Sequence, residues 1–302
     1  MSAPATAELQ AAIIGTYLKH LKLPAIARDY QQLAREAERE QAGYYGYLQA
    51  VLAREVHQRE EHAIAARLRR ARFPYPKRLE DFDFSVVPCL QKTQVLELAQ
   101  GAFLARHENV LVLGASGLGK THLLLGIARA LCVRGYRVAV RSAAALVTEL
   151  ELAQQELRLP RLLANLRRYD LVVVDELGYL PFSPQAAELL FQFFADRYER
   201  ASVGITSNLD FAHWTEVFGH ERMTAALLDR LVHRSTILLL EGESYRFRQS
   251  LARQSAPRPA DPPDAGTKRH VTHQTPADRA DADATRHVTQ QGGGHAAAAP
   301  VS

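Results

Sequence analysis

The central part of the chain alternates short apolar segments with longer segments of helical periodicity. Five apolar segments read as strands: NVLVLG (109–114), YRVAVRS (136–142), LVVVDE (171–176), ASVGITSN (201–208) and STILLLE (235–241). Helical segments separate them, such as the stretch from Pro184 to Arg200. Alternation of apolar strands with helices is typical of a parallel sheet that is covered on both faces. We therefore predict an α/β domain of three layers, α/β/α, over residues 74–254.

The pattern before this domain is helical. Pro24 suits the first turn of a helix. Four residues that follow fall on one face at helical spacing: Ile26, Tyr30, Leu33 and Ala37. A second helix carries its own apolar face, made of Leu48, Leu52 and Val56. We expect these faces to pack together in a small all-helical N-terminal domain over residues 1–73, which ends at the breaker sequence FPYP (73–76).

The composition changes after residue 254. Residues 255–302 contain no large apolar residue beyond a few valines, so this segment cannot bury enough surface to offset its chain entropy. We predict a disordered tail. Four histidines in it could bind a metal, although a solvated tail is the simpler interpretation: His270, His273, His287 and His295.

Charge and cysteine content narrow the class of protein only a little. The net charge of +4 and the isoelectric point near 9.1 favour an anionic partner. Cys89 and Cys132 form neither a disulfide framework nor a metal-ligand spacing, which indicates a reducing compartment. The sequence begins without a signal-peptide pattern, and no apolar run reaches the roughly 20 residues of a membrane span. We expect a cytoplasmic protein.

The first strand of the α/β domain ends in a phosphate-binding motif. The sequence GASGLGKT fits G-x-x-x-x-G-K-[ST], and a strand precedes it while a helix follows. Glycines let backbone N–H groups converge on phosphate oxygens, and the helix N-terminus adds partial positive charge. In this interpretation Lys120 reaches the β- and γ-phosphates of ATP and Thr121 ligates Mg²⁺. The whole motif is Gly114, Ala115, Ser116, Gly117, Leu118, Gly119, Lys120 and Thr121.

A second strand runs from apolar residues straight into two adjacent carboxylates. Behind a phosphate loop, Asp175 is placed to hold the Mg²⁺ ion and Glu176 to polarise the attacking water. The alternative is that these acids cap the helix that follows. The adjacent glutamate favours hydrolysis over phosphoryl transfer to a small substrate. The fourth strand ends in Thr206, Ser207 and Asn208, where a polar side chain could contact the γ-phosphate or instead cap the next helix.

A run of cations without any acid follows the second N-terminal helix, in the sequence AIAARLRRARFPYPKR (63–78). Its six basic residues suit a phosphate backbone: Arg67, Arg69, Arg70, Arg72, Lys77 and Arg78. Phe73 or Tyr75 could stack on bases. The alternative is a solvated helix end, where cations interact well with the helix dipole. Nothing here resembles a base-reading module, so we expect double-stranded DNA to be bound with little sequence specificity.

The combined motifs resemble a known family. The chain is similar to the IstB family of AAA+ ATPases, the helpers that accompany insertion-sequence transposases, and also to the helicase loader DnaC and the initiator DnaA. The resemblance covers roughly residues 8 to 250 and is carried by GASGLGKTH, VVVDELGYLPFS, ITSN, HERMTAALLDRLVHRS and GESYRFRQS. It implies a P-loop sheet of strand order 5-1-4-3-2, ATP-dependent assembly into an oligomer on DNA, and delivery of that DNA to a transposase.

The resemblance also implies roles for single residues. Lys120 and Thr121 bind ATP and magnesium, and His122 belongs to the same motif. The other roles fall on Asp175 as a magnesium ligand, Glu176 as the catalytic glutamate, Asn208 as the first sensor, Arg230 as the arginine offered to a neighbour's ATP, and Arg246 as a second sensor. For Arg230 the alternative is an ion pair within the chain, to Asp229 or Glu221.

Two other functions compete with a transposition helper. A helicase loader would share the same ATPase core, and the neighbouring gene would separate the two. A metabolic P-loop kinase would need a substrate pocket and a lid, and the positions of Glu176 and Arg230 argue against it.

Overall fold

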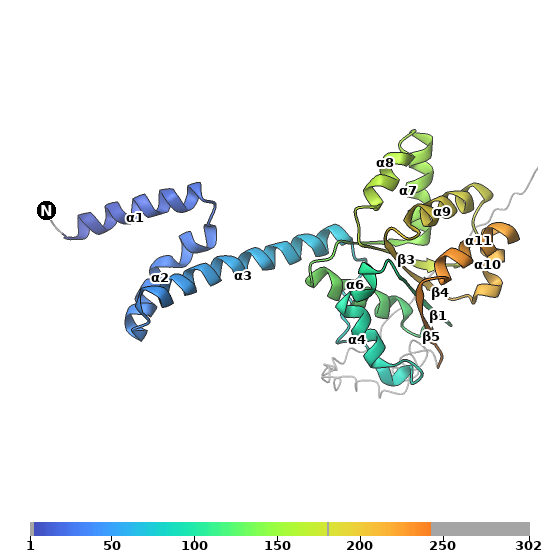
Figure 1. Ribbon diagram of the computed structural model, residues 1–302, viewed down its shortest axis with the longest axis horizontal. Helices are drawn as coiled ribbons and strands as arrows, with labels where there is room; N and C mark the ends of the chain where they lie inside the picture. The colour runs from blue at the N-terminus through green and yellow to red at the C-terminus, as the bar shows by residue number, and fades with distance from the viewer. Residues whose placement is uncertain (1–2, 180, 243–302) are drawn as a thin grey trace, which may run out of the picture. The chain divides into compact units, whose positions relative to one another are not determined.

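The computed structural model describes residues 3–179 and 181–242 (Figure 1). The predicted tail over 255–302 and the predicted second sensor Arg246 lie outside these residues. Within the described part of the chain, no helix is both long enough and apolar enough to span a bilayer.

The centre of the α/β domain is a parallel sheet whose strands coincide closely with the predicted apolar segments. They are β1 (Asn109–Gly114), β2 (Val138–Ser142), β3 (Leu171–Leu177), β4 (Ser202–Ser207) and β5 (Ser235–Leu240). Their order in the sheet is β2-β3-β4-β1-β5, so the predicted order 5-1-4-3-2 is confirmed. All strand pairs are parallel, and the carboxyl ends of β1, β3 and β4 therefore meet at one edge.

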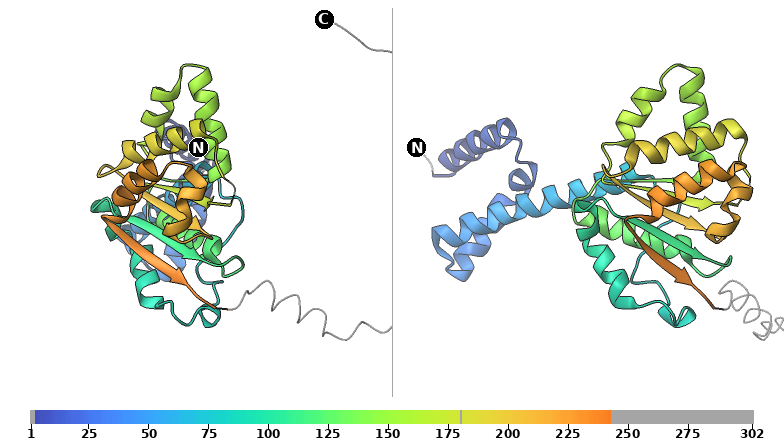
Figure 2. Two further views of the ribbon diagram at one scale, coloured as in Figure 1. Left: turned by 90° about the vertical axis from the view of Figure 1, so that its right-hand side faces the viewer. Right: turned by 45° about the vertical axis from the view of Figure 1, so that its right-hand side comes forward.

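Helices cover both faces of this sheet (Figures 1 and 2). One face packs against α4 (Lys92–Gln100) and α6 (Lys120–Val133), with the short α5 (Ala102–Ala105) and the 3-10 turn η1 (Phe84–Val86) nearby in the chain. The other face packs against α7 (Ala143–Gln155), α8 (Leu159–Leu166), α9 (Pro184–Arg197), α10 (Trp214–Phe218) and α11 (Glu221–Val232), with η2 (Phe211–His213) between β4 and α10.

Strands β1, β2 and β3 each contribute to both hydrophobic cores because successive side chains alternate between the faces. In β1, Val110 and Val112 belong to the core under α6, whereas Leu111 belongs to the core under α7 and α9. In β3, Val173 and Val174 divide in the same way. The predicted three-layer architecture is thereby confirmed, and it explains why the strands read as continuous apolar runs.

The N-terminal helices are α1 (Ala3–His20), α2 (Pro24–Glu40) and α3 (Gly43–Ala71). Ile26 is buried, and Tyr30 and Leu33 pack beside it, as the spacing in α2 predicts. The predicted face of α3 is wrong: Leu48, Leu52 and Val56 are 51%, 50% and 55% exposed.

A polar interaction accounts for the different face of α3. Glu55 is buried and accepts hydrogen bonds from the backbone N–H groups of Ala25 and Ile26, at 3.0 and 3.2 Å. It thereby caps the start of α2, where the first N–H groups have no partner inside the helix. Val51, one turn earlier on α3, then faces α2 and joins the core there. The spacing of apolar residues alone predicts the face that carries Leu48, Leu52 and Val56, because it gives no weight to the polar contact of Glu55.

The last turns of α3 pack onto the α/β core. Ala71 is fully buried there, and Leu68 and Phe73 lie against the same cluster as α6. The helix ends at Ala71, and Arg72 adopts a left-handed backbone conformation that stops it. This end lies close to the domain boundary predicted between residues 73 and 74, which stays a prediction.

Candidate active site

The phosphate loop connects β1 to α6 and has room only for glycine at two positions. At Gly114 φ is +145°, and a Cβ atom would lie 2.2 Å from the backbone oxygen of Leu240 on β5. At Gly119 φ is +87°, and a Cβ atom would lie 3.0 Å from the ring of Phe82. Gly119 is also the N-cap residue of α6 and provides no side-chain cap. The first N–H groups of this helix are thus available to an anion such as a phosphate.

Lys120 lies within the curve of the loop. Its ammonium group donates hydrogen bonds to the backbone oxygens of Gly114 and Ala115, at 2.7 and 2.8 Å. These contacts hold a positive charge where the loop turns into α6. The chain therefore brings together the two features that bind a triphosphate, a cationic side chain and a helix N-terminus.

The predicted magnesium ligands are in direct contact. Thr121 donates its hydroxyl hydrogen to Oδ1 of Asp175, with 2.9 Å between the oxygens, and Asp175 is only 7% exposed. Carboxylate and hydroxyl oxygens are the hard donors that Mg²⁺ prefers, so this pair fits the ion. The alternative, in which Asp175 caps the next helix, is wrong, because Ser183 accepts the capping hydrogen bond from the N–H of Ala186 at the start of α9.

Glu176 occupies an unusual backbone position. The pairing of β3 with β4 shifts between Val174 and Leu177, so that two residues of β3 stand against one residue of β4. Glu176 has φ of +60°, in the left-handed region, which costs a residue other than glycine about 1–3 kcal/mol. In a regular strand, adjacent side chains point to opposite faces, and a bulge changes that direction. The bulge therefore removes the requirement that the two neighbouring acids point to opposite faces of the sheet.

Thr206 is the β4 residue that stands against the bulge, and our sequence reasoning did not single it out from its neighbours. Its hydroxyl donates to Oδ1 of Asp175 at 2.5 Å and accepts the backbone N–H of Glu176 at 2.8 Å. It is almost fully buried. The sequence does contain a signal for Thr206, which is a polar residue near the end of an apolar strand. In the sheet, that strand is the neighbour of the strand that carries the two acids.

Asn208, the predicted first sensor, is exposed just after β4. The alternative in which it caps the following helix is wrong, because Asp210 performs that role for η2 by accepting the N–H of His213 at 3.3 Å. Its contact with a γ-phosphate stays a prediction.

The segment before α4 lies against the phosphate loop. Nε2 of His122 is 2.8 Å from the backbone oxygen of Arg78, and the His122 ring meets the Phe82 ring edge-on at 5.5 Å between centroids. The same Phe82 ring lies beside Gly119. His122 therefore joins the loop to the chain that leads back to α3.

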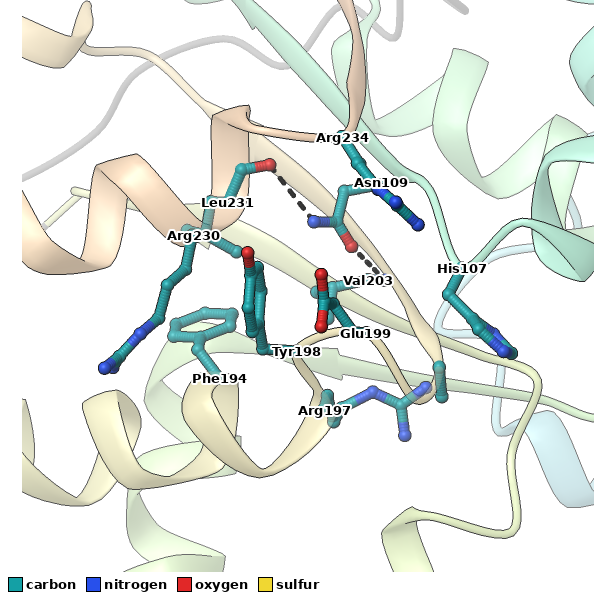
Figure 3. A pocket seen from close by; sticks show the side chains of 11 residues that line it. His107, Asn109, Phe194, Arg197, Tyr198, Glu199, Val203, Arg230, Leu231 and Arg234 are labelled. Carbon is teal, nitrogen blue, oxygen red and sulfur yellow. Dashed lines mark hydrogen bonds between the residues drawn. The ribbon is translucent and has the colours of Figure 1, made fainter.

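Arg230 lies beside a pocket at the amino ends of the strands (Figure 3), whereas the phosphate loop follows the carboxyl end of β1. Arg230 lines this small pocket together with Asn109 and Val203, which stand at the amino ends of β1 and β4. Asn109 of β1 joins α11 to β4: its side-chain amide donates to the backbone oxygen of Leu231 on α11, and its side-chain oxygen accepts the backbone N–H of Val203 on β4. Because β1 runs from Asn109 to Gly114, about 17 Å of strand separates this pocket from the phosphate loop of the same chain.

The guanidinium of Arg230 has an aromatic partner. It lies over the ring of Phe191 at 4.8 Å from the centroid. No ion pair of Arg230 occurs among residues 3–179 and 181–242, so the predicted alternative of a bond to Asp229 or Glu221 is wrong. One of its terminal nitrogens is buried without a hydrogen-bond partner in that same part of the chain.

The six cations proposed for DNA do not share one environment. Five are exposed: Arg69, Arg70, Arg72, Lys77 and Arg78. Arg67 is half-buried and donates from Nε to the backbone oxygen of Cys132 at 2.7 Å, which ties α3 to α6. One N–H of the Arg67 guanidinium is therefore engaged within the chain, and its contact with DNA stays a prediction.

Comparison with known proteins identifies the family. The family model for IstB-like ATP binding proteins matches residues 16–253. A protein of insertion sequence IS21 from Pseudomonas aeruginosa is 39% identical over 77% of this chain and 88% of its own length. Its counterpart in insertion sequence IS5376 from Geobacillus stearothermophilus is 36% identical over 78% and 94%. The names of both relatives refer to ATP binding.

Solved structures are similar over shorter stretches. AMPPCP-bound DnaA from Aquifex aeolicus matches 60% of this chain and 56% of that chain, with 21% identity and a TM-score of 0.48. The DnaC helicase loader matches 49% of this chain and 87% of that chain, with 19% identity and a TM-score of 0.40. The match to the family model covers most of the chain and includes the whole phosphate loop and both acids of β3. The chain belongs to the family of IstB-like ATP binding proteins of insertion sequences.

Proposed function

We propose that this protein binds and hydrolyses ATP. The proposal rests on one observation: Thr121, the last residue of the phosphate-loop motif, donates a hydrogen bond to Asp175 of β3. Lys120 and the N-terminus of α6 bind the phosphates, while Thr121 and Asp175 hold Mg²⁺. When bound there, the ion would supply positive charge against the phosphate oxygens. Glu176 orients and polarises the attacking water, and Asn208 contacts the γ-phosphate.

We further propose that ATP drives assembly of this chain into an oligomer on double-stranded DNA, and that the assembly recruits a transposase and stimulates insertion into that DNA. Relatives that share 39% and 36% of the aligned residues belong to insertion sequences, which favours this role over helicase loading. In this proposal residues 1–73 contact DNA or the partner and residues 74–254 form the ATPase domain. The exposed cations between Arg69 and Arg78 provide the phosphate contacts on DNA.

Replacing Lys120 with alanine tests ATP binding. The variant loses the charge that faces the β- and γ-phosphates, and we expect its affinity for ATP to fall by at least about 100-fold in a calorimetric titration. Lys19→Ala, which removes an exposed lysine from α1, is the matched control and should bind ATP like the wild-type protein. Equal affinity for ATP in the Lys120 variant would contradict the proposed site.

Neutralising three exposed arginines tests the DNA surface. Changing Arg69, Arg70 and Arg72 to glutamine should weaken binding to every DNA sequence and reduce the slope of log K against log salt by about 3. Arg67 is left in place because its loss would disturb the contact between α3 and α6.

The control for that experiment carries the same loss of charge elsewhere. It replaces three exposed arginines of the proposed ATPase domain, namely Arg161, Arg168 and Arg200. This control should retain the affinity and the salt slope of the wild-type protein. If both triple variants change the slope equally, only net charge matters and the proposed surface is wrong.

A further inference from the structure

We propose that Thr206 is a positioning residue that holds both acids of the ATPase site, Asp175 through its side chain and Glu176 through its backbone. The inference rests on the proposed hydrolysis of ATP and adds to it a residue outside the phosphate loop and the acidic pair. Thr206 lies at the end of β4 and is 1% exposed. It contacts neither the phosphate loop nor α6 in any hydrogen bond described above, so its action passes through the two acids.

The hydrogen bonds of Thr206 account for its whole donor capacity. A hydroxyl group has one hydrogen to donate and two lone pairs that accept. Thr206 donates to Oδ1 of Asp175 at 2.5 Å and accepts the N–H of Glu176 at 2.8 Å. Because Thr121 donates to the same oxygen at 2.9 Å, Oδ1 is held from two sides, by α6 and by β4. The carboxylate cannot rotate without breaking one of these bonds.

The second bond fixes the bulge that carries Glu176. The ladder between β3 and β4 pairs Val174 with Ile205 and Leu177 with Ser207, so Thr206 stands alone against the two acids. The extra residue of a bulge loses its regular ladder partner. Here the side chain of Thr206 supplies the acceptor that the ladder does not, and it supports the left-handed conformation of Glu176.

The identity of residue 206 argues for a role beyond packing. Valine has nearly the same shape, suits a buried strand and would continue the apolar pattern of β4. The neighbouring Ser207 shows what a local polar contact looks like, because its hydroxyl accepts the N–H of Leu209 two residues on. Thr206 instead bonds across to the adjacent strand, at the two residues assigned to magnesium and water.

Comparing Thr206→Val with Thr206→Ser tests the inference. Valine removes the hydroxyl at nearly constant shape, and we expect kcat for ATP hydrolysis to fall about 10- to 100-fold, as for a buried group that loses its hydrogen-bond partner. The KM for ATP should change by less than about threefold, because the phosphate loop is intact. Serine keeps the hydroxyl and should restore most of the rate. Thr236→Val on β5, a threonine outside the site, should hydrolyse ATP like the wild-type protein.

Amide hydrogen exchange provides a readout that does not depend on turnover. In a mass-spectrometric measurement of the segment 171–179, the Glu176 amide should exchange about 10-fold faster in Thr206→Val than in the wild-type protein and in Thr206→Ser. If the wild-type protein hydrolyses no ATP, the proposed function fails while this measurement still tests the contact. Unchanged exchange, an unchanged kcat in Thr206→Val, or equal losses in the valine and serine variants would overturn the inference.

Discussion

Replacing Glu176 with glutamine should nearly abolish ATP turnover while ATP binding stays close to that of the wild-type protein. The amide has almost the same shape as the carboxylate, but it cannot accept a proton from the attacking water or polarise it as strongly. Removing a general base of this kind typically lowers kcat by about 10²–10⁴-fold. The substitution spares the backbone N–H that Thr206 accepts, so the bulge of β3 should persist.

We expect assemblies of this variant to accumulate on DNA, because they bind ATP but do not hydrolyse it. We would measure steady-state hydrolysis, ATP affinity by calorimetry, and the fraction of protein that sediments with DNA in the presence of ATP. Glu188→Gln, at an exposed position of α9, is the matched control and should behave like the wild-type protein in all three measurements. Turnover near the wild-type rate in the Glu176 variant would assign the water-activating role to another residue.

Most of the α/β domain could be predicted from the sequence because its signals are local. A buried parallel strand needs only a run of apolar residues, and NVLVLG gives β1 with the bounds that the structure shows. Gly135 follows the end of α6 closely, as a helix stop should. The phosphate loop is also local, since its glycines, Lys120 and Thr121 are adjacent in the chain.

The parts that could not be predicted depend on contacts between distant residues. The face that α3 turns toward α2 is set by Glu55, which caps a helix that begins 31 residues earlier in the chain. Arg67 looks like any other cation in its run until Cys132 of α6 is found beside it. The bulge at Glu176 leaves no periodic signal, because one extra residue in a strand of seven changes the pattern too little.

Replacing Arg230 with alanine should stop ATP hydrolysis at the site of a neighbouring subunit. About 17 Å of strand separates the pocket beside Arg230 from the phosphate loop of its own chain. If Arg230 acts on a bound ATP, this placement favours the site of another subunit. Arginines that play this part in other phosphate-loop enzymes contribute roughly 10³–10⁵ in rate. We therefore expect Arg230→Ala to bind ATP normally and to hydrolyse it at least about 10³-fold more slowly.

The environment of Arg230 suits such a role. Its charge is not neutralised by a carboxylate in the described part of the chain, and a cation–π contact such as that with Phe191 is worth about 0.5–2 kcal/mol, depending on how far it is desolvated. A phosphate oxygen would also supply the hydrogen-bond acceptor that the buried terminal nitrogen of Arg230 lacks in the described part of the chain. Arg222→Ala, at an exposed position of the same helix, is the matched control and should hydrolyse ATP normally.

Mixing two inactive variants distinguishes a shared site from a structural role. Lys120→Ala subunits retain Arg230, and Arg230→Ala subunits retain an intact phosphate loop. If subunits associate head to tail, random mixing of equal amounts makes about a quarter of the interfaces complete, and activity should return to about that fraction. Each variant alone should stay inactive. A mixture that remains inactive although both variants co-assemble on DNA would contradict the shared site, as would normal hydrolysis by Arg230→Ala alone. In either case Arg230 would serve only the packing of α11 on α9.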